Sequence, residues 1–388
     1  MRRIYLDHAA TTPADERVAA AMLPCLTDNF GNAHSLHAFG RRAAAAVDEA
    51  RDKVASLLGA KPREIYFTSG GTEADNWALR GAARAGAGKG RHVVLSAVEH
   101  PAVRAAARRL AEDGFEVAAA PVGADGVLDL PAFASLLRED TVLAAVMAVN
   151  NETGAVQPLA EVSRLCRARG VLLFCDAVQA AGAYPLDVNA PPVDLLSISA
   201  HKFYGPKGVG ALYVREGVRI APLVTGGEQE RGLRGGTTNV AGAVGMAEAL
   251  SLARAELSAA QLRAGGACEA FVRLVLAEAK GARLNGPRQA CLSFASGGRL
   301  YSLANFSFAG VDGSALLALL DRLGVAASGG SACSSGSPEP SPVLAAMGLP
   351  ASLARSGVRF SFGRENTEAD AAEAFSRLRQ ALARLRAR

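Results

Sequence analysis

Short apolar runs and longer amphipathic stretches alternate along the first half of the chain. The runs are rich in β-branched residues and predict buried strands, whereas the Ala, Leu and Arg content of the stretches favours helix. The predicted strands are Glu64–Phe67, His92–Ser96, Val142–Val149, Val171–Cys175, Leu195–Ser199 and Gly210–Val214. The predicted helices between them include Thr72–Arg84, Pro101–Glu112 and Leu159–Arg169. This order is typical of βαβ units, so we expect a parallel sheet with helices on both faces.

A different order of elements begins near Val240. A long helical pattern comes first, and strand and helix patterns follow it. They are Ala241–Leu262, Leu303–Phe308, Ser314–Leu323, Val358–Ser361 and Glu368–Arg386. We therefore predict a large domain over residues 14–255 and a small α+β domain formed by residues 1–13 and 256–388. The small domain contains a Ser-, Gly- and Pro-rich segment, 328–342, which we expect to be an irregular loop.

Composition limits the classes of function. A chain of 388 residues, of which 50% are hydrophobic and 20% charged, can bury a large core. Its 42 basic and 37 acidic residues give a net charge of +5 without a basic block, so nucleic-acid binding is not expected, while small anionic ligands are compatible. No apolar run reaches the length of about 18 residues that predicts a membrane span. Asp7 precedes any signal-like apolar stretch, so we expect no cleaved leader.

The six cysteines are scattered along the chain without a C-x-x-C pair. This spacing argues against a zinc ribbon and a disulfide framework, and it fits the reducing cytoplasm. No other metal site is predicted, because His34 and His37 are two ligands short of a convincing set.

Three motifs carry candidate chemistry, and the first is Thr68–Glu73, with the sequence TSGGTE. It lies between a predicted strand and a predicted helix, where glycines and the free N–H groups of a helix start can hold a phosphate. An ordinary strand-to-helix turn with a Thr cap explains this segment equally well when it is taken alone.

The other two motifs follow neighbouring strands. Asp176 lies at the edge where open α/β sheets bind ligands, and there it could pair with a protonated ring nitrogen or merely cap the next segment. Lys202 could form a Schiff base with a carbonyl group or be a solvated surface lysine. Because one further strand separates the two residues, we expect both at the same edge of the sheet.

A phosphate cradle, an acid and a lysine together meet the three requirements of pyridoxal phosphate. Nucleotide binding fits less well. Gly86–Gly90 lacks the first glycine and the Ser or Thr of a P-loop, and the glycines of Gly205–Gly210 are in the wrong order for a dinucleotide motif.

The chain resembles the cysteine desulfurases of the NifS/IscS type, pyridoxal-phosphate enzymes of the class V aminotransferase superfamily. The resemblance extends over nearly the whole chain and rests on the order and number of its motifs. They are Leu6–Thr12, Phe67–Glu73, Glu99–Val103, Val149–Gly154, Asp176–Gln179, Ser199–Lys202, Gly226–Gly232, Arg234–Thr237, Ser331–Cys333 and Arg359–Arg364. It implies an α/β fold of the aspartate aminotransferase type, with a mostly parallel sheet in the large domain and a smaller α+β C-terminal domain.

The resemblance also implies a role for each matching residue. Lys202 would bind the cofactor aldehyde, and Asp176 would keep the ring nitrogen protonated. Gln179 would bond the phenolic oxygen, and His100 would stack on the ring and move protons. The residues implied around the phosphate are Gly71, Thr72, Ser199 and His201, with Thr237 reaching the cofactor of a neighbouring subunit in a homodimer.

Substrate binding and sulfur transfer are implied for three further residues. Arg359 would grip an amino-acid carboxylate through two parallel hydrogen bonds, with help from Asn151, which also adjoins the cofactor. A salt bridge at a strand edge is the alternative for Arg359. Cys333 would accept sulfur, because its Ser- and Gly-rich loop gives a thiolate exposure and freedom to move.

The remaining cysteines are predicted to be inert. Cys25, Cys166, Cys268 and Cys291 lie in helical or apolar contexts and are expected to pack in the core. Cys175 adjoins Asp176 in a strand, so the alternation of side chains turns it away from the cofactor.

The implied reaction converts L-cysteine to L-alanine and leaves the sulfur on Cys333 as a persulfide. An acceptor protein in iron–sulfur cluster assembly, or in tRNA or cofactor thiolation, would then take it. A selenocysteine lyase or another class V lyase is the nearest alternative, and a sulfur-relay or docking protein with little turnover is the alternative from another class. Two segments depart from the family pattern, Gly31–Ser35 and Ser341–Leu344, and Pro342 is expected to alter loop mobility and sulfur delivery.

Overall fold

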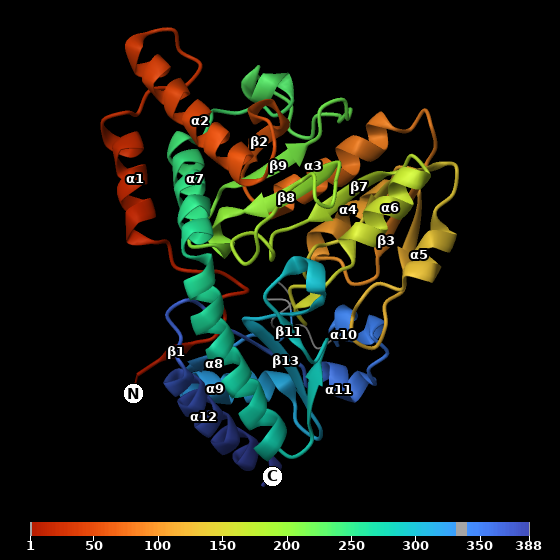
Figure 1. The fold of residues 1–388 in the computed structure, drawn as a ribbon, viewed down its shortest axis with the longest axis vertical. Helices are drawn as coiled ribbons and strands as arrows, with labels where there is room; N and C mark the ends of the chain where they lie inside the picture. The colour runs from red at the N-terminus through yellow and green to blue at the C-terminus, as the bar shows by residue number, and fades with distance from the viewer. Residues whose placement is uncertain (1, 331–339, 388) are drawn as a thin grey trace.

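The computed structural model describes residues 2–330 and 340–387, and its largest sheet has seven strands (Figure 1). The strand order is β2-β9-β8-β7-β5-β3-β4, in which β9 runs antiparallel to both of its neighbours and the other pairs are parallel. The strands are β2 (Ile65–Thr68), β3 (His92–Ser96), β4 (Glu116–Ala120), β5 (Thr141–Ala145), β7 (Leu172–Asp176), β8 (Leu195–Ser199) and β9 (Gly210–Val214). The prediction of a mostly parallel sheet is confirmed.

Helices cover both faces of this sheet because apolar side chains alternate along its strands. In β3, Val93 and Leu95 belong to the core that is shared with α3 (Gly71–Ala85) and α4 (Pro101–Glu112), whereas Val94 belongs to the core on the other face. The helices that contribute to that second core include α2 (Ala38–Leu57), α5 (Leu130–Leu136), α6 (Leu159–Ala168) and α7 (Val240–Ala255). Trp77 of α3 is fully buried.

A second, antiparallel sheet lies among the C-terminal elements in the lower half of Figure 1. Its order is β10 (Ala282–Asn285), β13 (Leu303–Phe308) and β15 (Val358–Ser361). Phe271 of the neighbouring α8 (Leu257–Glu278) packs against three aromatic rings of this region, Phe306, Phe360 and Phe362. The other elements there are α9 (Gly313–Arg322), α10 (Pro342–Ala346), α11 (Ala351–Arg355) and α12 (Glu368–Arg386).

Short strands connect distant parts of the chain. β1 (Ile4–Tyr5) pairs in parallel with β14 (Val325–Ala326), so the N-terminal residues lie beside the C-terminal elements. A small sheet combines β6 (Ala155–Val156), β11 (Ala290–Cys291) and β12 (Gly298–Leu300). The predicted domain division stays a prediction, and the pairing of β1 with β14 is compatible with it.

Two predicted elements are wrong in extent. The helix predicted over Ala241–Leu262 is interrupted at Glu256, where α7 ends, and α8 then continues to Glu278. The strand predicted over Val142–Val149 ends at Ala145, after which the backbone N–H groups of Val146 and Ala148 still bond to the strand β7. Apolar composition alone did not reveal either interruption.

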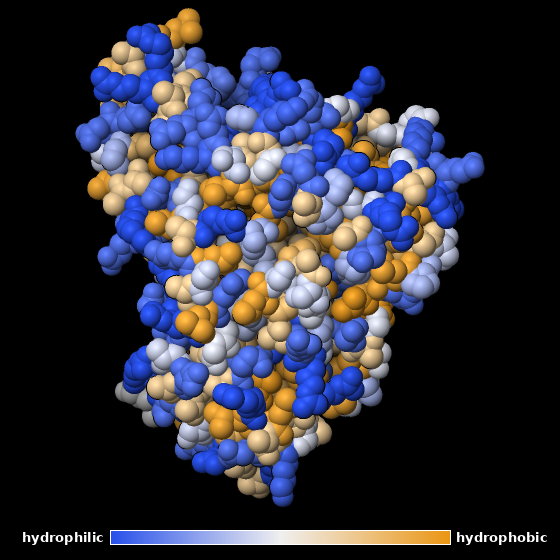
Figure 2. Space-filling model, viewed as in Figure 1, coloured by the Kyte–Doolittle hydropathy of each residue, from blue (hydrophilic) through white to orange (hydrophobic). Residues whose placement is uncertain are grey.

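A group of exposed apolar side chains lies at the protruding end formed by α1 (Glu16–Thr27) and α2, where Figure 2 shows apolar residues among polar ones. The group comprises Leu23, Leu26, Phe30, Leu36 and Phe39. Within residues 2–330 and 340–387, no helix has the length and apolar character needed to cross a membrane.

Candidate active site

The carboxyl ends of β2, β3, β5, β7 and β8 surround a cavity of about 160 Å³. Parallel strands present their ends at one edge of the sheet, which is where open α/β sheets bind ligands. The predicted site residues that line this cavity are Gly71, Thr72, His100, Asn151, Asp176, Gln179, Ser199, His201, Lys202 and Arg359. The structure therefore brings these residues together from six different segments of the chain.

The predicted phosphate cradle lies at the start of α3. Gly70 has a φ of 151°, and Gly71 is the first residue of the helix. A Cβ atom on Gly71 would lie 2.8 Å from Cγ2 of Val178, so a side chain does not fit there without displacing its neighbour. The helix start thus turns its free N–H groups toward the cavity without obstruction by a side chain at this position.

Asp176 is the last residue of β7 and is only 4% exposed. Its Oδ1 accepts a hydrogen bond of 2.9 Å from the backbone N–H of Val178. Burial raises the pKa of this carboxyl, while nearby His100 and Lys202 oppose the shift. A buried acid with a positively charged neighbourhood is suited to pair with a protonated ring nitrogen.

Lys202 ends a short 3₁₀ turn, Ala200–Lys202, that follows β8 directly. Its Nζ donates hydrogen bonds to the backbone oxygens of Ala9 and, over 3.0 Å, of Ala10. The amide of Gln179 also donates to the oxygen of Ala9, over 2.9 Å. The N-terminal segment therefore supplies acceptors to the cavity, a contribution that the sequence analysis did not predict.

His100 is the N-cap residue of α4, and this position fixes its ring. Its Nδ1 accepts a hydrogen bond of 3.2 Å from the backbone N–H of Ala102. Burial lowers the pKa of His100, which favours the neutral ring. Because a backbone N–H can only donate, the neutral ring carries its proton on Nε2.

His201 directly precedes Lys202 and also lines the cavity. Its Nδ1 is 3.2 Å from Oγ1 of Thr11. Burial lowers the pKa of His201 to about 4, and the charges of Lys202 and Lys207 act in the same direction. The ring is therefore neutral near pH 7.

Arg359, in β15, is 1% exposed and reaches the cavity from the second sheet. Its Nη1 donates to the backbone oxygen of Asn151 over 2.7 Å, and its Nη2 forms an ion pair of 2.9 Å with Asp7. Its Nε has no hydrogen-bond partner among the described residues. Arg359 thus forms the salt bridge of the alternative prediction, with Asp7. Its Nε–H group has no acceptor among the described residues.

A set of hydrogen bonds holds the turn that follows Lys202. The backbone N–H and the hydroxyl of Thr12 both donate to the oxygen of His201, each over 2.9 Å, and the N–H of Tyr204 donates to the Thr12 hydroxyl. Tyr204 has a φ of 65°, and its hydroxyl accepts a bond of 2.9 Å from the N–H of Arg364. These contacts restrain a residue in the left-handed region two positions after Lys202.

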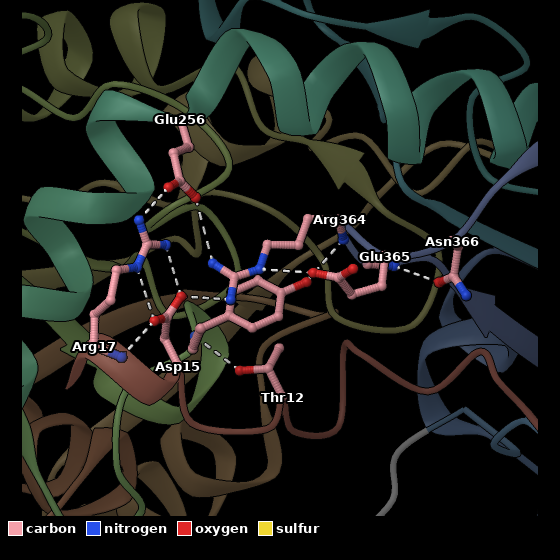
Figure 3. Close-up of polar contacts among 9 residues, drawn as sticks. Thr12, Asp15, Arg17, Glu256, Arg364, Glu365 and Asn366 are labelled. Carbon is pink, nitrogen blue, oxygen red and sulfur yellow. Dashed lines mark hydrogen bonds and ion pairs between the residues drawn. The ribbon is translucent and has the colours of Figure 1, made fainter. Parts of the chain in front are cut away.

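An ionic network, which we call the Asp15 network, consists of Asp15, Arg17, Glu256 and Arg364 (Figure 3). Asp15 pairs with Arg17 over 2.8 Å and with Arg364 over 2.5 Å. Glu256 pairs with the same two arginines, over 2.6 and 3.4 Å. The network connects the start of α1, the junction of α7 and α8, and the segment after β15.

Glu152 contacts described residues on both sides of positions 331–339. Its Oε2 accepts a hydrogen bond of 2.5 Å from the hydroxyl of Ser341. The same oxygen would lie 2.5 Å from a Cβ atom on Gly330, so the backbone of Gly330 approaches the carboxyl closely. Burial raises the pKa of Glu152. Glu152 belongs to the motif Val149–Gly154, but the sequence pattern does not predict this contact.

One predicted site residue among those that the structure describes is not part of the cavity lining. Thr237 is exposed and lines a different hollow, together with Ser69 and Arg234. Cys333 lies outside the described residues, so its predicted role stays a prediction.

The other cysteines have the packing expected of inert thiols. Cys166, Cys175, Cys268 and Cys291 are buried, and Cys25 is partly buried. Burial raises the pKa of each thiol, to about 12 for Cys166 and about 11 for Cys268. Among the described residues, these five therefore offer no readily formed thiolate.

The sequence profile of the family described as "Aminotransferase class-V" matches residues 4–373 of the chain. The chain belongs to the class V aminotransferases. It is 46% identical over 369 residues to a protein of Dictyoglomus turgidum named "Cysteine desulfurase IscS", and the match covers 95% of this chain and 92% of that relative. A protein with the same name from Anaeromyxobacter sp. (strain Fw109-5) is 49% identical over 373 residues, 94% of this chain and 89% of the relative.

Solved structures of other proteins share the fold. One titled "NIFS-LIKE PROTEIN" is 36% identical with a TM-score of 0.90, and the match covers 99% of this chain and 100% of that one. Another, titled "SspA in complex with cysteine", is 32% identical with a TM-score of 0.79, and covers 93% and 99% of the two chains. The predicted fold of a pyridoxal-phosphate-dependent transferase is confirmed.

Class V aminotransferases of this kind depend on pyridoxal phosphate, and the cavity residues fit that cofactor. The open helix start at Gly71 suits the phosphate, buried Asp176 suits the ring nitrogen, and Lys202 lies on the same cavity wall to meet the aldehyde. Arg359 lines the same cavity, and its buried Nε has no hydrogen-bond partner among the described residues.

Replacing Asp15 by Asn tests the stabilising effect of the ionic network. We predict that Asp15→Asn lowers the free energy of unfolding at pH 7 by about 1.5–3 kcal/mol, because it removes the charge of the acceptor from three hydrogen bonds donated by Arg17 and Arg364 while Asn still caps α1. Arg17, followed by Arg364, holds the pKa of Asp15 below its ordinary value of 3.8, so this stabilisation is present above pH 3.8 and is lost as the pH falls further. Urea unfolding at pH 7 and pH 3 measures both effects.

Glu365→Gln is the matched control, since Glu365 also pairs with Arg364 but is 74% exposed. We expect a change of no more than about 1 kcal/mol for this variant. An Asp15→Asn deficit of equal size at both pH values would contradict the assigned origin of the stabilisation.

Proposed function

We propose that this class V aminotransferase is a cysteine desulfurase that converts L-cysteine to L-alanine and holds the released sulfur as a persulfide on Cys333. The observation that carries the proposal is that Lys202, Asp176, His100 and Arg359 line one cavity. Relatives with 46% and 49% identity over almost the full chain are named cysteine desulfurase, and a structural neighbour is titled as a complex with cysteine. These names support L-cysteine as the substrate.

Different cavity residues would bind different parts of the cofactor. Lys202 would hold the aldehyde, Asp176 the ring nitrogen and Gln179 the phenolic oxygen. When bound, pyridoxal phosphate supplies an electron-withdrawing ring that takes up the electron pair released at Cα of an amino acid. The residues that would surround its phosphate are Gly71, Thr72, Ser199 and His201.

The substrate carboxylate would bind at Arg359. Its Nε is buried and unpaired, and a carboxylate there would satisfy it with a charged hydrogen bond. Asn151 and Asp7 already hold the other side of the guanidinium, so they orient Arg359 instead of competing for the same N–H group. The sequence prediction of two parallel hydrogen bonds from Arg359 stays a proposal.

Two groups of this chain move protons in the proposed reaction. Lys202 Nζ, which lines the cavity, would remove the proton from Cα of the amino acid. His100 is neutral with its proton on Nε2, so a proton that it takes up would go to Nδ1, in place of the hydrogen bond from Ala102, and Nε2 would then give its proton to the reacting group. Both residues line the same cavity.

Sulfur transfer uses Cys333 as the nucleophile. The thiolate attacks the sulfur of the substrate, an S–S bond forms, the Cβ–S bond breaks with its electron pair passing to the carbon side, and a proton at Cβ completes alanine. The five described cysteines have raised pKa values, which leaves Cys333 as the candidate. An acceptor protein for iron–sulfur assembly or thiolation then removes the sulfur, in keeping with the IscS name of the relatives.

A homodimer is part of this proposal. Exposed apolar side chains gather on α1, α2 and the segment between them, and they would be buried by a second copy. Thr237 is exposed outside the cavity of its own chain, so it is available to a partner's cofactor. We place the protein in the cytoplasm, because the five described cysteines are all free thiols.

Incubation with L-cysteine is the direct test of the function. We expect alanine to form, and mass spectrometry without reductant to find one added sulfur on the peptide that contains Cys333. Cys333→Ser removes the adduct, whereas the matched variant Cys25→Ser keeps it, since Cys25 lies outside the cavity. Alanine without an adduct on Cys333 would favour a lyase, and no alanine from protein loaded with pyridoxal phosphate would favour a relay or docking role.

Arg359→Lys tests substrate binding. We expect the KM for L-cysteine to rise by about tenfold or more, because lysine lacks the planar fork that bonds Asn151 and a carboxylate together. Arg283→Lys, at an exposed position on β10 of the same sheet, is the matched control and keeps the KM. An unchanged KM in Arg359→Lys, measured at equal cofactor content, would remove the carboxylate role.

Light scattering after gel filtration tests the dimer. We expect twice the mass of one chain for the wild type and the mass of one chain for Leu36→Asp/Phe39→Asp, because two charges would then lie in the apolar contact. Leu262→Asp, on α8 and 80% exposed, serves as a control that keeps the dimer. A wild-type protein with the mass of one chain would contradict the proposal.

A further inference from the structure

A second buried carboxyl lies beside Asp176, and the proposed reaction gives it no task. Asp75, in the second turn of α3, is 1% exposed and also lines the cavity. Side-chain oxygens of Asp75 and Asp176 and a ring nitrogen of His100 lie within 4.8 Å of one another. Oδ1 of Asp75 accepts a hydrogen bond of 2.6 Å from the hydroxyl of Ser197, in β8.

Two carboxylates at this separation and burial repel each other strongly, so one of them takes a proton. The charged groups that face the pair differ between its members. Asp176 accepts the N–H of Val178 and has Lys202 nearby, and both favour its anion. Asp75 receives one neutral hydroxyl.

A third acid adds negative potential on the same side. Glu99 is 1% exposed and precedes His100. Its Oε1 accepts the N–H of Met147 over 2.8 Å, and its Oε2 has no partner in the part of the chain that the structure describes. Because Glu99 is itself an acid, it does not favour an ionised Asp75.

We propose that Asp75 is a positioning residue that carries the proton of this carboxyl pair, so that Asp176 is the anion that meets the ring nitrogen of the cofactor. A neutral Asp75 fills the buried space beside Asp176 without a second charge, and Ser197 holds it in place. The inference rests on the proposed function only for the pairing of Asp176 with the cofactor, because the location of the proton is a property of the protein.

The electrostatics agree with this geometry. Burial, followed by the charge of Asp176, raises the pKa of Asp75 well above its ordinary value, and Ser197 opposes the shift while Glu99 adds to it. A folded-state pKa above that of the unfolded chain contributes stability at low pH that is lost as the pH rises. Asp75→Asn, which resembles the protonated acid but cannot ionise, should therefore gain stability relative to wild type as the pH rises from 4 to 9.

Infrared difference spectroscopy on the full-length protein loaded with pyridoxal phosphate tests the proposal. The spectrum of the wild type minus that of Asp75→Asn, at pH 7.5, should contain the C=O stretching band of a protonated carboxyl group. A difference that contains carboxylate bands instead would overturn the proposal. So would a stability of Asp75→Asn that falls relative to wild type over the same rise in pH.

Asp176→Asn tests the coupling within the pair. Removal of the neighbouring anion should lower the pH at which the band of Asp75 disappears by about 1–3 pH units. An unchanged midpoint would overturn the assignment of Asp75 as the partner of Asp176. The pH midpoint of the band reports the ionisation of one carboxyl group, so a change in packing alone would not produce this shift of the midpoint.

Ser197→Ala keeps the proposal testable if Asp75→Asn does not fold. Loss of the hydroxyl, which favours the anion of Asp75, should raise the midpoint of the band, and a lowered midpoint would contradict the proposal. Alanine production from L-cysteine is measured separately on the wild type. If no alanine forms, the proposed function fails, while the infrared result on Asp75 still stands or falls by itself.

Discussion

The N-terminal segment of residues 4–12 joins the two sheets that form the cavity, and the geometry of the site depends on its backbone contacts. Ile4 pairs with Val325, the N–H of Ala9 bonds the hydroxyl of Ser361 over 2.8 Å, and the oxygen of Ala9 accepts from Lys202. Asp7 forms the ion pair with Arg359. One short segment therefore sets the positions of the two cationic side chains at the proposed cofactor and substrate sites.

The distribution of charge in the cavity follows from this arrangement. Lys202 and Arg359 bring positive charge from the two sheets, and buried acids oppose them from the β7 and α3 side. Buried charges require partners of opposite charge. A ligand that carries both anionic and cationic groups would therefore pair with the cations and with the acid of this cavity. An anionic phosphate, a protonated ring nitrogen and an amino-acid carboxylate together meet that requirement.

Much of the fold follows from local pattern. The strands β3, β8, β9, β13 and β15 and the helices α4 and α12 agree with the predicted bounds, since each is a strongly periodic or continuous apolar run between clear boundaries. β4 was missed because its sequence, EVAAA, lies at the sheet edge and is only partly buried. At the interruption, Glu256 forms ion pairs with Arg17 and Arg364, contacts that no local pattern contains.

The same limit applies to the site. Residues such as Lys202 and Asp176 were predicted because their motifs end strands of a parallel sheet, and parallel topology fixes where strand ends lie. The contact of Asp7 with Arg359 joins positions 352 residues apart, and Asp75 lies within a helix where nothing in the spacing distinguishes it from a surface acid. Only the tertiary structure reveals the contact of Asp7 with Arg359 and the burial of Asp75.

The N-cap position of His100 has a consequence for how protons pass through the site. Its Nδ1 is occupied as the acceptor that begins α4, so a second proton on the ring would deprive the helix of its cap. Proton uptake by this imidazole is thus coupled to the start of α4, and the intact helix start favours the neutral ring.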